Sequence, residues 1–381
     1  MATILSALFK KFFQSEKSGG MILAFCTAFS MLLTNLGADN YVALWNTPMG
    51  SHTLVQWIND GLMTVFFLLI GLELEREIYI GELSSLRNAL FPVFAALGGM
   101  LVPAGLYLAI NQNGGDTSGA GIPMATDIAF ALGALSMLGN RVPASLKVFL
   151  TALAVIDDLG AIIVIAVFYS SSLDLQSFGI AMAVFGLLLV FNRLRVHNLL
   201  PYLLGGIIMW YFMLSSGIHA TLTGVLLAFA IPFGNGDERS PSYILQDKLH
   251  GPVAYFILPV FALANTCILI DAGAMDSLGG LVSMGIIVGL VLGKPIGILL
   301  FTFGASVLKI ASLPEDLKWT QILGTGALAG IGFTMSIFIT LLAFNDETLI
   351  NASKLSVLIA SLTAGIVGFL ILKAKLPRSA D

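Results

Sequence analysis

Residues 150–169 read LTALAVIDDLGAIIVIAVFY, and this stretch decides the fold class. Asp157 and Asp158 stand in the middle of an apolar run long enough to cross a bilayer, which takes about 20 residues. The whole chain of 381 residues is 57% hydrophobic and only 10% charged, against about 25% charged residues in typical soluble domains. Its mean hydropathy is +0.94. The composition excludes a water-soluble globular enzyme and predicts an all-α membrane protein.

Apolar runs recur along the whole chain and predict twelve transmembrane helices. The expected spans are residues 20–37, 54–72, 89–110, 121–138, 145–169, 177–192, 199–215, 217–233, 251–270, 279–303, 320–344 and 354–372. They leave no room for a soluble domain. We therefore expect one integral membrane domain over residues 1–381, with a short cytoplasmic or interfacial helix in residues 1–19 before the first span.

The basic residues support this count. Lys and Arg gather on the cytoplasmic side of membrane proteins, and sixteen of the 18 here fall in alternate loops and in the two termini. The exceptions are Lys354, at the edge of the last span, and Lys294, inside a span. Both termini are therefore expected in the cytoplasm. The net charge of −4 is too small and scattered for nucleic-acid binding, and two cysteines in apolar runs do not indicate a disulfide framework.

Four ionisable residues lie inside predicted spans, namely Asp127, Asp157, Asp158 and Lys294. Each costs about 2.5–3.5 kcal/mol at a helix centre, so they are expected to face one another or water. A single Asp–Lys pair is as readily structural as functional. Three carboxylates with one ammonium do not balance, however, so the surplus carboxylates must hold protons or a cation.

Two spans contain helix-breaking residues. Pro123 precedes Asp127 in span 4, and Gly330 and Gly332 lie in the glycine-rich span 11. Close helix packing through small residues is the alternative explanation. Because the two spans are seven apart, they cross the membrane in opposite directions. This arrangement is typical of inverted-repeat transporters, with repeats here at residues 89–169 and 279–372.

An ordered set of motifs covers nearly the whole chain and resembles the NhaA family of bacterial sodium/proton antiporters. The motifs are WINDGLMTVFFLLIGLELERE (57–77), ATDIAFALG (125–133), LTALAVIDDLGAIIVIAVFY (150–169), SGIHATLTGV (216–225), LVLGKPIG (290–297) and GIGFTMSIFI (330–339). The resemblance implies twelve spans, with spans 4 and 11 unwound and crossing at mid-membrane. It also implies that Asp157 and Asp158 bind ions and protons, together with Thr126, Asp127 and Lys294.

The resemblance is weaker at two places. The cytoplasmic cluster that the family uses for its pH response is matched by Glu73, Arg76, Glu77 and His250, but Gln246 and Asp247 replace an expected Glu and His. An ordinary solvated charge run is the alternative for this cluster. His219 also matches a pH-response residue, and a structural histidine is equally compatible. The loop at residues 37–53 is shorter than the family's β-hairpin, so a homodimer is possible but not indicated.

The expected function is electrogenic export of Na+ or Li+ in exchange for H+, regulated by pH. Protons and Na+ would compete for Asp157 and Asp158, with the Thr126 hydroxyl as a further Na+ ligand. This predicts a transporter of the bacterial inner membrane that serves pH homeostasis and salt tolerance. It would have lipid as its surroundings, no resident cofactor and no enzyme activity.

Three alternatives remain open. A sodium-coupled solute symporter would need a solute-sized polar cavity, and the spans carry no Arg and no cluster of Asn or Gln. An intramembrane aspartyl protease would need a GxGD motif, which the sequence lacks. A channel would conduct far faster than a carrier.

Overall fold

The computed structural model describes residues 2–37, 39–169, 173–270 and 276–376, and the chain is mostly helical (78%). Eight helical segments within these residues are long and apolar enough to cross a membrane: Ser18–Asn35, Leu54–Tyr79, Leu86–Asn111, Thr117–Ser136, Ala144–Phe168, Leu175–Arg193, Leu281–Val307 and Glu347–Lys375. A ninth is obtained if Trp319–Ala329 and Phe333–Ala343, which are bent by 48°, count as one span.

The three other predicted spans correspond to helices that are shorter than the predicted ranges. The range 199–215 contains α9 (Leu200–Ser215), and 217–233 contains only α10 (Leu222–Ala230). The range 251–270 contains η5 (Val253–Ile257) and α12 (Leu258–Asn265). The chain turns at Gly217 (φ +82°) before α10, and Pro232 follows the extended Ile231 that ends the helix. Twelve spans therefore remain a prediction.

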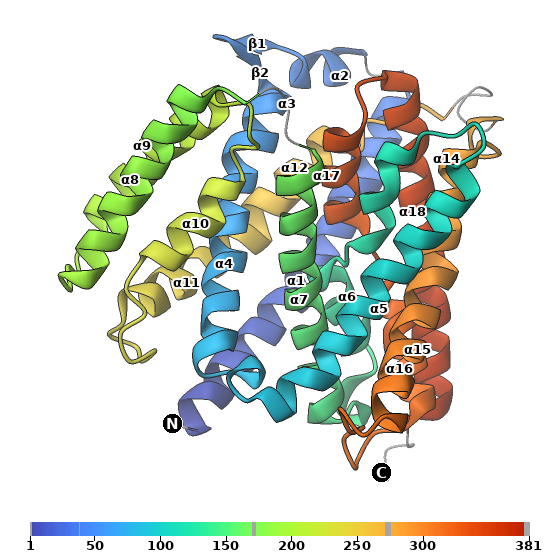
Figure 1. Cartoon of the computed structure of the whole chain (residues 1–381). Helices are drawn as coiled ribbons and strands as arrows, with labels where there is room; N and C mark the ends of the chain where they lie inside the picture. Colours follow the sequence, from blue (N-terminus) through green and yellow to red (C-terminus); the bar gives the residue numbers. More distant parts are fainter. Residues whose placement is uncertain (1, 38, 170–172, 271–275, 377–381) are drawn as a thin grey trace. The chain divides into compact units, whose positions relative to one another are not determined.

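The chain folds into two compact units. The first comprises residues 1–37, 85–161 and 265–381, and the second comprises residues 38–84 and 162–264. Both predicted repeats, 89–169 and 279–372, fall in the first unit except for residues 162–169. The two units are described separately below (Figure 1).

The first unit is built from long helices and two interrupted ones. Its elements are α1 (Ala2–Asn35), α5 (Leu86–Asn111), η3 (Thr117–Met124), α6 (Ile128–Ser136), η4 (Gly139–Arg141), the greater part of α7 (Ala144–Phe168), α14 (Leu281–Val288), η6 (Gly289–Gly293), α15 (Lys294–Val307), α16 (Trp319–Ala329), α17 (Phe333–Ala343) and α18 (Glu347–Lys375). The separate short helix expected in residues 1–19 is instead continuous with the first span in α1. The helix passes Gly20, where a side chain would press on the Ala129 carbonyl of α6.

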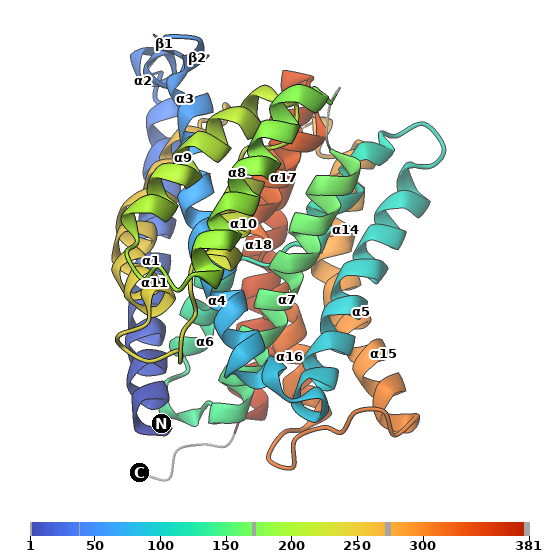
Figure 2. The same cartoon turned by 60° about the vertical axis from the view of Figure 1, so that its left-hand side comes forward.

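Close backbone packing holds α5 against α15. The two helices run side by side in Figures 1 and 2. A Cβ atom on Gly98 would collide with the Gly297 carbonyl, and one on Gly297 with the Gly98 carbonyl. Small residues at both positions allow this approach. This close approach places the start of α15, including Lys294, against the middle of α5.

The second unit contains a two-stranded hairpin and several helices. Its elements are α2 (Asp39–Trp45), β1 (Pro48–Met49), β2 (His52–Thr53), α3 (Leu54–Trp57), η1 (Ile58–Leu62), α4 (Met63–Tyr79), η2 (Glu82–Ser84), α8 (Leu175–Arg193), α9, α10, α11 (Pro241–Pro252), η5 and α12 up to Ala264. The strands are antiparallel, pairing Pro48 with Thr53 and Met49 with His52. The short loop at residues 37–53 thus still forms a hairpin.

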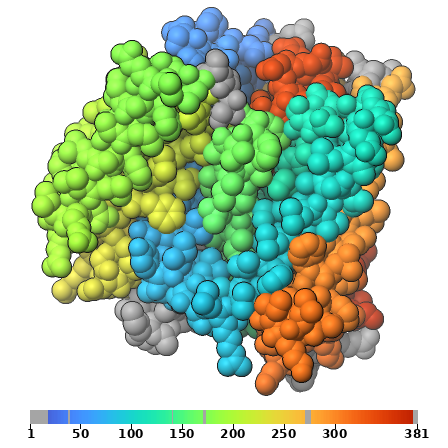
Figure 3. Space-filling view, viewed as in Figure 1, coloured from blue at the N-terminus to red at the C-terminus, as the bar shows by residue number. Residues whose placement is uncertain are grey.

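Two helix pairs dominate the second unit. In the first pair, α4 packs along α10, and Gly71 and Gly224 each fit against the partner helix. In the second pair, α8 and α9 lie side by side (Figure 2), and their surface is visible in Figure 3. The two helices expose the apolar side chains Leu187, Leu189, Val190, Leu204, Ile207 and Ile208. Exposed aliphatic side chains of this kind suit contact with lipid.

Candidate ion-binding site

The first interruption lies between η3 and α6. The chain is extended at Ala125 (φ −77°, ψ 151°) and at Asp127 (φ −87°, ψ 100°), and α6 begins at Ile128. Asp127 is the N-cap of α6, because its Oδ1 accepts a hydrogen bond of 3.0 Å from the Phe130 amide. Pro123 lies in η3, directly before the extended segment, and supplies no amide proton to continue a helix.

The second interruption lies between α16 and α17. The helix α16 ends at Ala329 with Gly330 as its C-cap, and Gly332 is the N-cap of α17. A side chain at Gly330 would collide with the Leu290 carbonyl of η6, so only glycine fits there without a shift. The bend between the two half-helices is 48°. The break therefore leaves free backbone groups inside the first unit.

Asp127 joins the two interruptions. Its Oδ2 accepts hydrogen bonds from the Thr334 amide (3.0 Å) and the Thr334 hydroxyl (2.5 Å), and its own amide donates to the Ile331 carbonyl (2.6 Å). One carboxylate thus satisfies amides at the starts of both α6 and α17. A negative charge is favourable there, because helix N-termini are partly positive.

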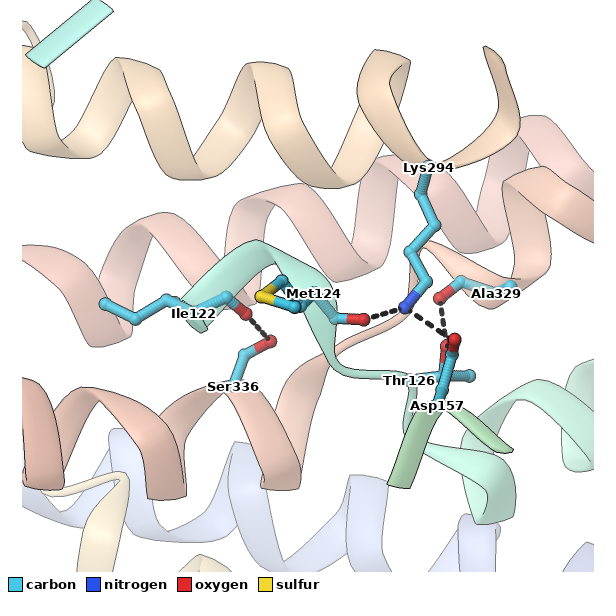
Figure 4. A network of polar contacts seen from close by, with 7 residues as sticks. All are labelled: Ile122, Met124, Thr126, Asp157, Lys294, Ala329 and Ser336. Carbon is cyan, nitrogen blue, oxygen red and sulfur yellow. Dashed lines mark hydrogen bonds and ion pairs between the residues drawn. The ribbon is translucent and has the colours of Figure 1, made fainter. Parts of the chain in front are cut away.

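Two serines, which the sequence analysis did not identify, also satisfy the broken helices. The Ser361 hydroxyl of α18 accepts a hydrogen bond of 3.1 Å from the Phe333 amide. The Ser336 hydroxyl of α17 donates to the Ile122 carbonyl of η3 (2.7 Å), as Figure 4 shows. Sequence alone gives no signal for these roles, since serines in spans often bond only to their own helix.

Thr126, Asp157 and Lys294 form a buried cluster beside the interruptions (Figure 4). The Lys294 ammonium lies 2.8 Å from Asp157 Oδ2 and also donates to the Met124 carbonyl. The Thr126 hydroxyl lies 2.7 Å from the same Oδ2 and 2.9 Å from the Ala329 carbonyl. That hydroxyl has one proton for two acceptors, so its own oxygen remains available to a proton or a cation.

Asp158 is fully buried, and neither of its oxygens has a hydrogen-bond partner among the described residues. The same is true of Asp157 Oδ1. Three carboxylate oxygens are therefore unsatisfied next to a cluster with one ammonium group. Burying an ionised carboxylate without a partner costs several kcal/mol, so a proton or a cation bound here would stabilise the arrangement.

The structure thus brings together Thr126, Asp127, Asp157 and Lys294 through hydrogen bonds and the segment 125–127, and Asp158 follows Asp157 in α7. No group of three or more His, Cys, Asp or Glu side chains close enough to hold a metal ion occurs among the described residues. A cation at this cluster would therefore rely on two carboxylates supplemented by hydroxyl and carbonyl oxygens.

The residues predicted for the pH response lie in the second unit, mostly at the end of α4 and in α11. The His250 Nε2 lies 3.6 Å from Glu73 Oε1, and the Arg76 guanidinium lies over the Tyr243 ring at 5.2 Å. The carboxylate of Glu77 accepts a hydrogen bond of 3.0 Å from the Glu82 amide. These contacts give each of the charged groups a partner within the unit.

The two other residues predicted for the pH response are His219 and Asp247. His219 lies before α10, and its Nε2 forms a hydrogen bond of 2.7 Å with the Tyr169 carbonyl. Asp247 is half-buried on α11, one turn before His250. The geometry gives His219 a structural contact and leaves its role in a pH response a prediction.

Comparison with known proteins decides the family. A family model described as Na+/H+ antiporter 1 matches residues 10–372. The chain belongs to this family. It is 60% identical over 370 residues to the Na(+)/H(+) antiporter NhaA of Flavobacterium psychrophilum, covering 97% of this chain and 96% of the relative.

Two other relatives carry the same name. The protein of Dechloromonas aromatica is 57% identical, covering 97% of this chain and 96% of the relative. That of Citrobacter koseri is 49% identical, covering 96% and 98%. Family membership and the apolar helices together identify a multi-pass membrane protein.

Proposed function

We propose that this protein is an electrogenic secondary antiporter that exports Na+ or Li+ in exchange for H+. The observation that carries the proposal is Asp158, fully buried with both oxygens unpaired, directly following the Asp157 that pairs with Lys294. The name shared by the relatives supports the same assignment. The excess of buried negative charge has to be neutralised. The proton and the transported cation (Na+ or Li+) compete to do so.

The exchange follows from competition for the same oxygens. Na+ and Li+ are hard cations that prefer oxygen ligands. Asp158, Asp157 and the Thr126 hydroxyl provide them, and the carbonyls freed by the interrupted helices add neutral ligands. Protons bind to the same carboxylates. Since bare carboxylates are costly to carry through a low-dielectric barrier, only the protonated or the sodium-loaded site changes the side it faces.

Lys294 takes part in one of two ways. As a proton carrier, Lys294 loses a proton when Na+ breaks its 2.8 Å ion pair with Asp157. As a structural charge, it offsets the helix end at the Met124 carbonyl and the charge of Asp157 throughout the cycle. Lys294→Gln separates the two: electrogenic exchange that persists in this variant rules out an obligatory carrier.

The proposal includes the topology in which the site would work. It has twelve spans, two inverted repeats at 89–169 and 279–372, and interruptions that cross at mid-membrane. Both termini face the cytoplasm across the bacterial inner membrane. The sixteen basic residues in alternate loops support this orientation. The hydrogen bonds between Asp127 and α17 support the crossing.

A vesicle assay tests the function. Inverted membrane vesicles carrying an imposed pH gradient receive Na+, Li+ or K+, and collapse of the gradient is followed by a fluorescent pH probe. We expect collapse with Na+ and Li+ and none with Asp158→Asn. The matched control is Asp276→Asn, a change at an exposed aspartate of the same unit, which should behave as the unaltered protein. Sodium-dependent collapse that survives in Asp158→Asn would overturn the site assignment.

No observation favours the sodium-coupled symporter, and the names of the relatives describe exchange rather than solute uptake.

A further inference from the structure

Glu75 of α4 is a buried acid that neither the predicted pH cluster nor the exchange site uses. Its side chain is 3% exposed, and its Oε2 has no hydrogen-bond partner among the described residues. In sequence it stands between Glu73 and Glu77, both of which have partners. A buried side chain with an unpaired carboxyl oxygen, in a helix that could cross the membrane, calls for a physical explanation.

The packing of α4 against α10 indicates which helix the Glu75 side of α4 faces. Leu68 and Gly71 lie against α10, since a Cβ on Gly224 would touch the Leu68 amide and one on Gly71 would touch Ala228. Both helices advance in the same direction along this seam. By helical register, Glu75 comes one turn beyond Gly71 on the same face, in the direction in which α10 ends at Ala230.

The end of a helix is partly negative, because its last carbonyls lack intrahelical donors. At α10 the Ala230 carbonyl accepts a hydrogen bond of 3.0 Å from the Asn192 side chain of α8. An ionised Glu75 would add a negative charge at this same end. A protonated Glu75 is neutral and avoids this repulsion, and its O–H group can donate to a backbone carbonyl.

Among the described residues, no ion pair joins Glu75 to a charged group on the elements around α4. The helix α10 carries no titratable residue. On α11, Tyr243 lies under Arg76 and His250 pairs with Glu73. The other titratable or charged groups on the neighbouring elements are Asp60 of η1, Glu82 of η2, Arg193 at the exposed end of α8, Asp247 and Lys248 of α11, Tyr255 of η5, and Tyr79 of α4 itself.

We propose that the Glu75 carboxyl is a proton-binding site of the second unit, protonated at neutral pH and emptied under alkaline conditions. Loss of the proton leaves a negative charge against the negative end of α10 and weakens the α4–α10 seam. The site lies in a different unit from Asp157 and Asp158. Its influence on exchange rests on the proposed function, whereas proton binding itself does not.

Infrared spectroscopy on the full-length protein in detergent tests proton binding directly. We expect a carbonyl stretching band of a protonated carboxyl that is present at neutral pH, fades under alkaline conditions and is missing in Glu75→Gln. The control Glu238→Gln, at an exposed position of the same unit, should keep the band. Identical spectra for Glu75→Gln and the unaltered protein would overturn the proposal.

Thermal melting against pH gives a second readout. A group that holds a proton only in the folded state makes folding less favourable as pH rises. The unaltered protein and Glu238→Gln should therefore lose stability as Glu75 deprotonates. The variants Glu75→Gln and Glu75→Leu should fold and melt with a flatter pH dependence. If both variants fail to fold, or if both keep the original pH dependence, Glu75 is an ionised, paired group and the proposal is wrong.

Exchange assays then separate the two proposals. Glu75→Gln should retain sodium-dependent exchange, with an altered pH profile and an unchanged Na+ dependence at one fixed pH. Complete loss of exchange in a folded Glu75→Gln would make Glu75 part of the exchange machinery and contradict this inference. If the unaltered protein shows no exchange, the proposed function fails, while the infrared and melting results still decide the role of Glu75.

Discussion

The two charged regions of this protein differ in how their charges are paired. In the first unit, Asp127, Asp157, Asp158 and Lys294 are all buried, and of the three acids it is Asp157 that pairs with the one base. In the second unit, the end of α4 carries as many charged groups, yet most of them have partners in α11 and η2. Unpaired buried charge, rather than the number of charges, is therefore the feature on which the proposed ion-binding site rests.

The largest effect should come from breaking the buried ion pair. Asp157→Asn leaves the Lys294 ammonium buried without its counter-charge, and losing one partner of a buried pair costs about 3–5 kcal/mol. We expect a large drop in melting temperature and no exchange. The double variant Asp157→Asn with Lys294→Met should recover much of the stability but no exchange. Recovery of exchange in the double variant would contradict the role given to Asp157.

A smaller loss of stability is expected from Asp127→Ala. This change removes the three hydrogen bonds that the Asp127 carboxylate accepts from Phe130 and Thr334. Because bonds to a charged acceptor contribute more than neutral ones, we expect a loss of about 2–3 kcal/mol in the free energy of unfolding. Thermal melting measures it. Thr334→Val removes only the hydroxyl donor and should cost less. If Asp127→Ala and Thr334→Val lose the same stability, the bond from the Thr334 hydroxyl accounts for the whole effect and the two amide bonds contribute nothing.

Ser361→Ala should have an intermediate effect on stability. It leaves the Phe333 amide at the start of α17 without an acceptor, and an unsatisfied buried donor costs about 1–3 kcal/mol. The Na+ concentration for half-maximal exchange should rise, since Thr334 and Asp127 are held through α17. Ser361→Thr keeps the hydroxyl and should restore both quantities. Unchanged melting and exchange in Ser361→Ala would remove Ser361 from the account.

The smallest effect is expected in the paired region. Arg76→Gln removes a guanidinium that lies over Tyr243 at the partly exposed end of α4, a contact worth about 0.5–1 kcal/mol at such sites. Exchange should persist, with a shifted pH profile at most. Abolished exchange in a folded Arg76→Gln would make the α4 end as important as the buried cluster, and the comparison between the two regions would fail.

The buried cluster proposed as the exchange site could be predicted from sequence because its residues violate a strong rule. Asp157 and Asp158 interrupt an apolar run, and a charge there is costly wherever the neighbouring helices lie. Pro123, Gly330 and Gly332 similarly disfavour a continuous helix whatever surrounds them. Such signals are local, so a single sequence is enough to find them.

The remaining features depend on packing and could not be found in this way. Glu75 stands in a charged run, where a solvated side chain is the ordinary expectation, and it is the packing of the other helices around α4 that buries it. Ser336 and Ser361 look like other serines in spans until the broken helices present them with partners. The length of α10 likewise depends on the turn at Gly217 and on Pro232, which a count of apolar residues passes over.

The most direct test of competition between protons and Na+ is calorimetric. Titrating Na+ into the purified protein at several pH values, in buffers of different ionisation enthalpy, gives both the affinity and the number of protons released. If protons and Na+ compete, Na+ binding releases protons. Below the pH at which the site titrates, the apparent dissociation constant for Na+ should rise about tenfold for each pH unit of acidification and each competing proton. Sodium binding with the same affinity at every pH and no proton release would contradict it.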